Sequence, residues 1–507
     1  MNSKKKKKHK KIKFKNPYKK MSIPLILTSI ILLTQKQTNS LFQDPSETIS
    51  IRFAFSLSRT GAHSPSKVTY NENSENNKNY IDIFNNSWNG ENELTNVGKR
   101  QQFLLGYRHY ITYIDTFNNL LNKTYDPREI YASSSESNRT IQSAYAQLHG
   151  LYQEGTLLTD SQIPFSDPPN NKEFFQEEKE SLGLNTLPNN ILVTPVHTFY
   201  EKDHSFLLEK KENCPLGYKV IENIEKSDRV MNIRKEFVEK YGKKILSLVK
   251  IKKDGTHDIN LEYLINNGDF FKSCIETFIC NYFEDNNLIN EEIKTEEEVN
   301  EILNKIYSYM SEISLYNPNN INDNTKKFVT MVNIPLITQL ISWLKKKVEK
   351  DIKGEDTYTN YDVPKFISYS SHHYSLDSLN AFMNYTFNLK NKNIKYPQFT
   401  SFINIHLIYN KSKERKNDDY NVTYSFDEEE LLNMKYIDFI KELENVIKID
   451  NNTKKYCNYT DNDIQIDNGF NKYIVLTIIF GVIFVILIVI LIHFIMNKRT
   501  KIDRLLE

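Results

Sequence analysis

The chain of 507 residues is long enough for one large hydrophobic core, or for a core with a second lobe. Its 39% hydrophobic and 12% aromatic content is typical of a folded protein and excludes a generally disordered one. Eleven lysines lie in residues 1–20, so the formal net charge of +2 becomes −9 over residues 21–507. Since that acidic remainder offers no broad basic face, we expect no nucleic-acid partner.

A short apolar run near the start predicts entry into the secretory pathway. Residues 23–33 follow Lys19 and Lys20 and have the length of a signal-peptide core. The lysines at residues 4–8 fit either a nuclear or nucleic-acid-binding patch or a solvated tail. The apolar run favours the second interpretation, a basic tail and signal peptide over residues 1–39.

A second apolar segment, residues 473–496, predicts one transmembrane helix. It is uncharged apart from His493, and at about 1.5 Å per residue it is long enough to cross a hydrocarbon core of about 30 Å. Lys498 and Arg499 place the tail, residues 497–507, in the cytoplasm. We therefore predict a single-pass type I membrane protein whose domain is lumenal or extracellular, in a lysosome-like vacuole or at the cell surface.

Four cysteines fall in the predicted lumenal part: Cys214, Cys274, Cys280 and Cys457. An even number in an oxidising compartment favours disulfides, with Cys214 paired to Cys280 or Cys274, although a buried free thiol is the alternative. None has zinc-ligand spacing, and we predict neither a metal nor a cofactor. Sequons for N-glycosylation are compatible with this compartment. They include Asn85, Asn122, Asn384, Asn410, Asn421, Asn451 and Asn458.

The first part of the chain predicts alternating strands and helices. Residues 50–57 read as a strand that runs into a turn. Residues 93–113 have apolar side chains, Leu104 among them, near helical spacing, and Thr95 is placed as the N-cap. A short strand is expected at residues 130–133, followed by a helix that we expect over residues 140–151.

Further along, the pattern changes to long charged helices and then returns to strands. The predicted elements are helices at 230–251, 291–316 and 334–351, a strand at 366–369, a helix at 376–387 and a strand at 401–409. This order predicts an α/β three-layer sandwich formed by residues 50–169 and 331–415, with an inserted, mainly α-helical cap at 170–330. We expect residues 416–472 to form a membrane-proximal stalk.

Three polar segments follow predicted strands, where ligands bind in α/β sheets. They are residues 59–65 (RTGAHSP), 133–140 (SSSESNRT) and 370–373 (SSHH). A lone arginine in a loop is more often a surface salt-bridge partner, so each segment alone is weak evidence. Only their order along the chain, through the family resemblance that it carries, predicts one cationic site. Its members are Arg59, His63, Arg139, His372 and His373, with Arg139 near a helix start that favours anions.

The order of these segments resembles the histidine acid phosphatase family of the lysosomal and prostatic type. That family opens with an Arg-His-Gly-x-Arg-x-Pro motif, which residues 59–65 match at Arg, Gly and Pro. The resemblance continues in order to about residue 410, through blocks at 94–101, 131–140, 196–198, 213–215, 369–379 and 396–409. It implies the histidine phosphatase (phosphoglycerate-mutase-like) fold and hydrolysis of phosphate monoesters through a phosphohistidine.

The resemblance also shows which site residues depart from the pattern. Thr60 stands at the position of the nucleophilic histidine, His63 at that of the second motif arginine, and His373 at that of the aspartate that protonates the leaving alcohol. Arg59, Arg139 and His372 match the family. A threonine hydroxyl is a poor nucleophile without a base beside it, so the favoured interpretation is a pseudophosphatase that retains a phosphate-binding pocket.

Two other interpretations stay open. The chain could be an active acid phosphatase that uses a displaced His63 or direct water attack, since a protonated His373 can serve as an acid. Alternatively, the cap could be a protein-interaction module above a vestigial pocket. Under the favoured interpretation the ligand is a phosphate ester or another anion, bound more tightly as the pH falls through about 6.5. The remaining alternative is that these residues only form salt bridges with acidic neighbours. A homodimer is compatible with each of these interpretations.

Overall fold

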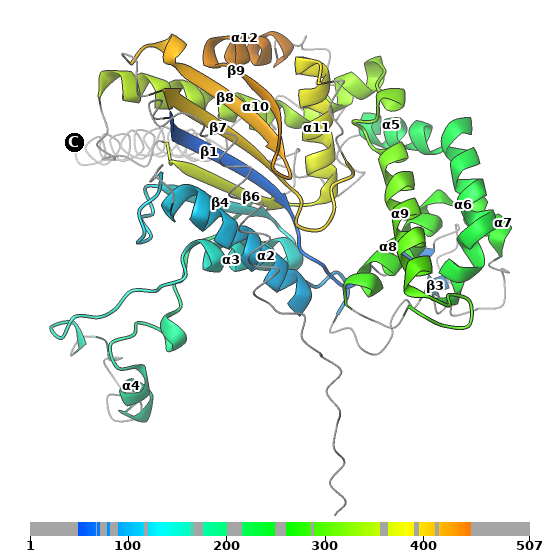
Figure 1. Cartoon of the computed structure of the whole chain (residues 1–507), viewed down its shortest axis with the longest axis horizontal. Coiled ribbons are helices and arrows are strands. Elements are labelled where there is room, and N and C mark those ends of the chain that lie inside the picture. The colour runs from blue at the N-terminus through cyan, green and yellow to red at the C-terminus, as the bar shows by residue number, and fades with distance from the viewer. Residues whose placement is uncertain are drawn as a thin grey trace, which may run out of the picture.

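The central feature of the chain is one mixed β-sheet, seen in a computed structural model (Figure 1). The structure describes residues 49–66, 68–70, 79–81, 90–115, 120–163, 166, 176–199, 215–248, 260–284, 288–354, 363–389, 395–410 and 415–447. The strand order is β5-β4-β6-β1-β7-β8-β9. The strands are β1 (Ile49–Arg59), β4 (Ile130–Ser135), β5 (His197–Phe199), β6 (Phe366–Ser371), β7 (Phe402–Asn410), β8 (Tyr420–Phe426) and β9 (Glu429–Lys435).

The sheet is parallel on one side and antiparallel on the other. Strands β5, β4, β6 and β1 run parallel, whereas β7, β8 and β9 are joined to β1 and to one another as antiparallel neighbours. A separate two-stranded ribbon pairs β2 (Val68–Tyr70) with β3 (Asn79–Ile81). Ligands of such sheets bind at the carboxyl ends of the parallel strands, so that edge is where the site is expected.

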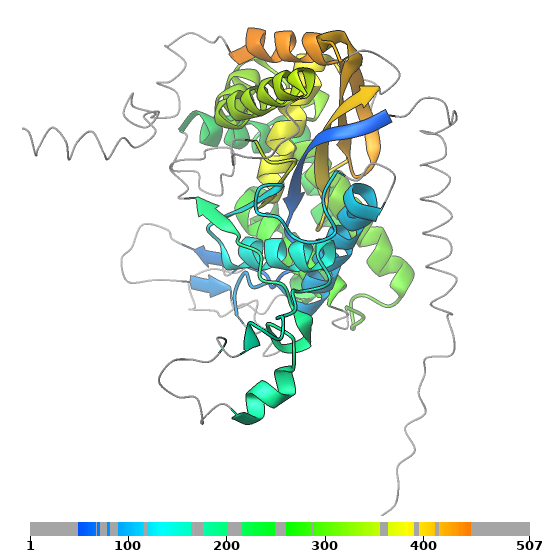
Figure 2. The same ribbon diagram turned by 90° about the vertical axis from the view of Figure 1, so that its left-hand side faces the viewer.

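Helices cover both faces of the sheet and make three layers (Figures 1 and 2). One face carries α2 (Asn96–Tyr110), extended by the π-helical turn Ile111–Asp115, and α3 (Asn138–Leu151). The other face carries α10 (Asp323–Lys353), α11 (His373–Phe387) and α12 (Tyr436–Ile447). This agrees with the predicted α/β sandwich.

A mainly helical lobe lies beside the sheet (Figure 1). Its helices are α5 (Pro215–Glu225), α6 (Asp228–Ser247), α7 (Leu261–Asn266), α8 (Gly268–Phe283) and α9 (Glu296–Ile313); the short α4 (Gln176–Leu182) precedes them. Phe271 of α8 packs edge-on against Phe237 and Tyr309 at 5.3 and 5.0 Å between ring centres. These rings belong to the same hydrophobic cluster as Phe53 and Phe55 of β1, so lobe and sheet share one core.

Most local predictions are confirmed, and two differ for physical reasons. Thr95 is the N-cap of α2, where its Oγ1 accepts a hydrogen bond from the backbone N–H of Gly98 at 3.1 Å. Helix α10 begins at Asp323, earlier than the predicted 334, and continues through Pro335. The prediction therefore covered only the second part of the helix, which contains Pro335 although proline removes one backbone hydrogen bond. Leu104 of α2 is 56% exposed, so the apolar spacing that predicted this helix does not mark its buried face.

The predicted stalk is wrong for residues 416–447. Strands β8 and β9 extend the sheet, and α12 packs on α10. Burial explains this, because Tyr420, Val422 and Tyr424 alternate along β8 and are fully buried. In addition, β5 joins the sheet edge although it lies within the predicted cap.

Several predicted segments lie outside the described residues: the signal peptide, residues 473–496, Cys214, Cys457, and the sequons at Asn85, Asn451 and Asn458. Among the described residues, α10 is the one helix long and apolar enough to cross a membrane, and 67% of its apolar window is buried, as in a core helix. Cys274 and Cys280 are buried free thiols, so the structure does not support a disulfide at either.

Candidate anion-binding site

Three strand ends bring the predicted site residues together. In the register of β1 with β6, Arg59 is opposite Ser371, and in that of β4 with β6, Ser134 is opposite Ser370. Thr60 and His372 therefore leave the sheet side by side, and the backbone N–H of Thr60 donates to the carbonyl of Ser371 at 3.1 Å. The segments that carry Arg59, Arg139 and His372 meet at this carboxyl edge.

The loop after β1 is held tightly against the first turn of α2. A Cβ atom on Gly61 would lie 2.3 Å from the carbonyl oxygen of Gly98, so only glycine allows this approach. The N–H of Ala62 donates to Oε1 of Gln101 at 2.9 Å, and Nε2 of Gln102 donates to the carbonyl of Arg59 at 2.7 Å. These contacts fix the backbone on both sides of Thr60.

Arg59 lies on aromatic rings rather than in an ion pair. Its guanidinium carbon is 4.4 Å from the ring centre of Phe399 and 5.8 Å from that of Tyr396, and its Nη1 donates to the carbonyl of Pro397 at 2.6 Å. Within the described part of the chain no carboxylate forms a salt bridge with Arg59, so its charge is not neutralised there. This argues against the alternative that Arg59 serves only as a salt-bridge partner.

Arg139 and His372 form the polar centre of the site. Nη2 of Arg139 lies 3.1 Å from Nδ1 of His372, and because a guanidinium only donates, this Nδ1 must accept and carry no proton. The proton of neutral His372 is therefore on Nε2, which donates to Oγ of Ser135 at 3.0 Å. Ser135 Oγ in turn donates to Oγ1 of Thr140 at 2.9 Å, so the chain of hydrogen bonds holds the imidazole in one orientation.

His63 and His373 complete the cationic set. Nδ1 of His63 donates to the carbonyl of Ser64 at 2.8 Å, and its ring packs edge-on against Phe399 at 4.9 Å between ring centres. His373 lies at the start of α11, with its ring 5.7 Å from that of Tyr396. All five predicted members of the site are thus brought together.

The environment of the three histidines favours their neutral form. Burial, together with Arg139 and Arg59, lowers the pKa of His63 to about 3. Burial and the two arginines likewise lower the pKa of His372 and of His373 well below the usual value. The ordinary histidine pKa of about 6.5 therefore does not describe these three side chains in this environment.

The cap contributes helix α8 to the wall of the site. Phe283 packs against Phe399 at 5.2 Å between ring centres. Burial and the charge of Glu276 raise the pKa of the Cys280 thiol. The positive charges of Arg59 and Arg139 act on the same thiol in the opposite direction, so α8 lies near both arginines. A thiol held protonated in this way is a poor nucleophile.

Aromatic and hydroxyl partners of the site were missed at the sequence level. Phe399 lies between Arg59 and His63, Tyr396 between Arg59 and His373, and Ser135 orients His372. The segment containing Tyr396 and Phe399 resembled the family in sequence, but it has no charged or nucleophilic residue that would have pointed to a site. Only the fold brings these rings to the strand ends.

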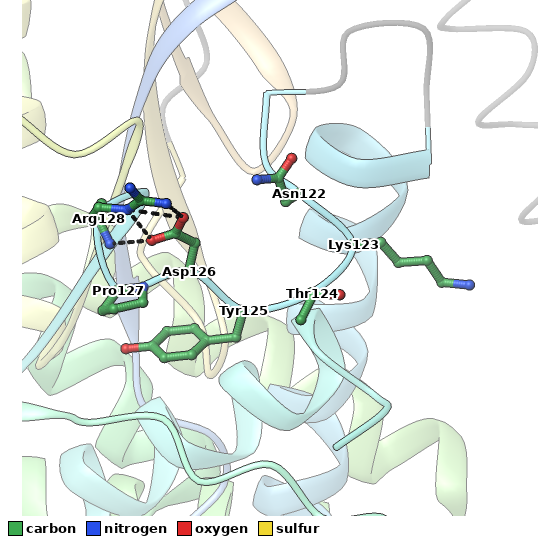
Figure 3. A pocket seen from close by; sticks show the side chains of 7 residues that line it. All are labelled: Asn122, Lys123, Thr124, Tyr125, Asp126, Pro127 and Arg128. Atoms are coloured by element: carbon green, nitrogen blue, oxygen red, sulfur yellow. Dashed lines mark hydrogen bonds and ion pairs between the residues drawn. The ribbon is translucent and has the colours of Figure 1, made fainter. Parts of the chain in front are cut away.

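A surface hollow elsewhere contains none of these residues. It is lined by the loop from Asn122 to Arg128, in which Arg128 and Asp126 form an ion pair at 2.5 Å (Figure 3). The side chain of Asn122, one of the predicted sequons, is exposed there, whereas Asn384 is buried and donates to the carbonyl of Tyr316. Among these two, only Asn122 has room for a glycan.

Comparison with known proteins identifies the family. The sequence model of the histidine phosphatase superfamily (branch 2) matches residues 2–427, so the chain belongs to this superfamily. The predicted resemblance is thereby confirmed.

Individual relatives are distant. The chain is 28% identical to the lysosomal acid phosphatase of Xenopus laevis over 173 residues, which are 34% of this chain and about a third (32%) of that protein. Similar solved structures include the Citrobacter braakii phytase (TM-score 0.44, 13% identity, 74% of this chain and 85% of that chain). Another is the Bifidobacterium longum multiple inositol polyphosphate phosphatase (TM-score 0.44, 11% identity, 78% and 89%).

Proposed function

We propose that this chain is a membrane-anchored pseudophosphatase that binds a phosphate ester or a related anion. The proposal rests on the identity of residue 60. Thr60 follows the end of β1 beside His372, and by the family resemblance this is the position of the nucleophilic histidine. The site keeps Arg59 and Arg139. The charges that act on its histidines are those of these two arginines, of Lys272 and of the histidines themselves. Such a site attracts an anion but lacks the imidazole that would attack phosphorus.

Anion binding should be coupled to proton uptake. A bound dianion would stabilise the protonated form of His63 and return its pKa from about 3 toward the ordinary value. If one histidine regains a pKa of about 6.5 on binding, affinity rises roughly thirtyfold between pH 8 and pH 5. The anion therefore binds more tightly in acid, because it raises the pKa of a histidine whose neutral form the protein otherwise favours.

Calorimetric titration of the detergent-solubilised chain with sulfate tests this function, because sulfate stays a dianion from pH 5 to pH 8. We expect tighter binding at pH 5 and heats that change with the ionisation enthalpy of the buffer. Arg139→Ala should weaken binding ten- to hundredfold, the usual value of charge-assisted hydrogen bonds. Arg128→Ala, which removes an exposed arginine of another loop, is the control and should bind like the wild type. Equal binding by both variants contradicts the proposal.

Introducing the residues that the family has at these three positions tests whether the chain lacks activity because its nucleophile and proton donor are replaced. The triple change of Thr60→His, His63→Arg and His373→Asp should give the chain measurable hydrolysis of an aryl phosphate at pH 5. The wild type is expected to show only the residual rate that positioning and electrostatics supply without a nucleophile, about 10³–10⁴-fold over water. Wild-type turnover comparable to that of the triple variant would contradict the pseudophosphatase interpretation.

One contact favours an active phosphatase as the second candidate. Because His63 donates from Nδ1 to the carbonyl of Ser64, its neutral ring leaves the lone pair on Nε2 available for attack. Arg59 and Arg139 would stabilise the charge that develops on the transferred phosphoryl group. If this candidate is correct, His63→Gln abolishes turnover while Thr60→Ala leaves it unchanged.

The location of the protein is part of the proposal. The matched Xenopus laevis protein is described as lysosomal, and the predicted span at residues 473–496 would hold the domain on the lumenal side of such a compartment. The exposed sequon at Asn122 fits the same topology. Glycosidase treatment of the expressed chain should reduce its mass, and Asn122→Gln should remove part of that change.

A further inference from the structure

Helix α2 carries its large apolar side chains on the outside of the protein. Its buried residues are largely polar or small: Gly98, Gln102, Leu105, Gly106 and His109. The large apolar side chains of α2 and its π-helical extension are instead 36% to 56% exposed: Val97, Phe103, Leu104, Tyr107 and Ile111. A helix that packs on a sheet usually turns such side chains inward, so the core does not account for them.

These exposed side chains form one continuous stripe along the helix. Val97, Leu104 and Ile111 are seven residues apart, about two helical turns, and therefore lie above one another on the same side. Phe103 and Tyr107 flank them within roughly a third of the helix circumference. We call these five residues the α2 stripe.

The anion site explains the buried side of α2 but not the stripe. Gln102 donates to the carbonyl of Arg59 and accepts from Nε2 of Gln147 at 2.6 Å, and Gly98 allows the close approach of Gly61. These contacts account for the polar and small residues that face the sheet. The described residues leave the stripe exposed, and apolar side chains gathered in this way on one element mark an interaction surface.

The first half of α2 is basic beside the stripe. Lys99 and Arg100 are exposed, and Arg100 lies about one helical turn before Leu104, on the side of the helix that carries the stripe. Helix α2 itself contains no acidic residue. Glu93, which precedes the helix, is turned toward α3, where its carboxylate accepts from two side-chain amides at 2.8 and 3.0 Å.

The second half of the stripe lies beside an acidic turn. Residues 427–430, which connect β8 to β9, are one aspartate and three glutamates, and the glutamates are exposed. Glu428 forms an ion pair with Arg108 of α2, which places this turn against the helix. Arg108 and Lys395 are the cations that act on Asp427. Four carboxylates thus outnumber two cations, and this end of the stripe is negative.

Opposite charges at the two ends suit two copies of the helix in antiparallel orientation. A two-fold axis at Leu104 sets each residue of one copy opposite the residue that lies equally far beyond Leu104 in the other copy. Residue 100 is four positions before Leu104, and residue 108 is four positions after it. Arg100 of one copy would therefore lie beside the acidic turn that adjoins Arg108 of the partner, and the symmetry makes this contact twice.

Other arrangements fit these charges less well. Parallel pairing of two copies would bring like charges together at both ends, which costs free energy. A bilayer would have to accept the exposed carboxylates of residues 428–430 at its apolar boundary, where unpaired charge is unfavourable. An antiparallel second copy covers the stripe and gives each end a counter-charge.

We propose that the α2 stripe joins two copies of this chain in a two-fold dimer, through an antiparallel contact between their α2 helices. Leu104 meets its own copy at the axis, with Phe103 and Tyr107 beside it. Figures 1 and 2 show α2 and α3 together on one face of the sheet, so the layer of α10, α11 and α12 faces away from the partner. The contact does not depend on what the anion site binds.

The dissociation constant of this dimer can be measured on the full chain in detergent, by light scattering during size-exclusion chromatography over a range of protein concentrations. Leu104→Glu, Arg100→Glu and Glu428→Lys should each raise it at least about tenfold, because each sets like charges opposite one another. Ile437→Glu is the control. This residue is 41% exposed on α12, on the other face of the sheet, and the variant should dimerise like the wild type.

A mixture of two variants tests the orientation. When chains with Arg100→Glu are mixed with chains that carry Glu428→Lys, the new carboxylate of one meets the new ammonium of the other, and the second contact keeps the native pair. We expect this mixture to dimerise within about threefold of the wild type, although each variant alone is weakened. Such recovery also shows that both variants are folded.

Three results would overturn the proposal. One is a wild-type chain that stays monomeric at every concentration. Another is a dimer that none of the changes on α2 or in the acidic turn weakens, since the copies would then associate elsewhere. The third is a mixture that fails to recover while each variant alone is weakened, which refutes the antiparallel contact.

Discussion

We expect buried His109 to make the folded chain less stable in acid, independently of the candidate anion site. Its side chain is 2% exposed, and its ring lies between those of Tyr113 and Phe366, at 5.5 and 5.3 Å between ring centres. Its Nε2 has no hydrogen-bond partner among the described residues. Burial, followed by the charges of Arg108 and His406, lowers the pKa of His109 to about 3.

The size and sign of the effect follow from this pKa. The folded state resists a proton that the unfolded chain binds with the ordinary pKa of about 6.5. Acid therefore favours the unfolded state, and the free energy of unfolding falls as the pH drops from about 6.5 to about 3. Between pH 8 and pH 5, His109 alone should lower it by about 2 kcal/mol.

The assay is urea unfolding of wild type and His109→Leu at pH 8 and pH 5, followed by circular dichroism. We expect the variant to gain about 2 kcal/mol relative to the wild type on going to pH 5. Leu443→Ala changes a fully buried side chain of α12, on the other face of the sheet, and it should lower stability equally at both pH values. If the difference between His109→Leu and wild type is the same at both pH values, the burial argument fails for His109 and loses force for the site histidines.

Three further changes test other parts of the account. Burial raises the pKa of Asp377 to about 7, so the folded state holds a proton that the unfolded chain has already lost at pH 6. The wild type should therefore lose about 1 kcal/mol of stability between pH 6 and pH 8, and Asp377→Asn should remove this loss. Urea unfolding midpoints at the two pH values measure it. Gly61→Ala would press a Cβ atom into the backbone of Gly98; we expect a cost of about 1–3 kcal/mol and loss of sulfate binding by calorimetry. Arg52 donates twice to Asp351, at 2.6 and 2.7 Å, and Lys347 also lies 3.8 Å from this carboxylate. Because Lys347 stays beside Asp351, Arg52→Ala should destabilise the fold by about 1–3 kcal/mol, and thermal unfolding checks this.

The sequence predicted those parts of the fold that depend on local pattern. The N-cap Thr95, strand β1 and helix α3 follow from capping chemistry and apolar spacing, and their positions agree closely with the structure. Strands β8 and β9 were missed because their role depends on pairing with β7, a contact between segments that no local pattern encodes. Helix α2 was predicted correctly as a helix, but its buried face was not, because the polar contacts of Gln102 fix that face.

The candidate site was predicted from the motif rather than from physics alone. Arg59, Arg139 and His372 could be placed because polar segments after parallel strands meet at one edge. The neutrality of the histidines could not be predicted, since the pKa depends on burial and on the distances to both arginines. The aromatic ring under the Arg59 guanidinium could not be predicted either, because Phe399 belongs to a segment far away in the sequence.

Trapping experiments measure directly whether the chain forms a covalent phosphohistidine intermediate. The wild-type chain is mixed with a ³²P-labelled aryl phosphate at pH 5, quenched in base and examined for base-stable phosphohistidine, with the triple variant that restores the family residues as positive control. If Thr60 has replaced the nucleophile, the triple variant carries the label and the wild type carries none. A labelled histidine in the wild-type chain would contradict the account.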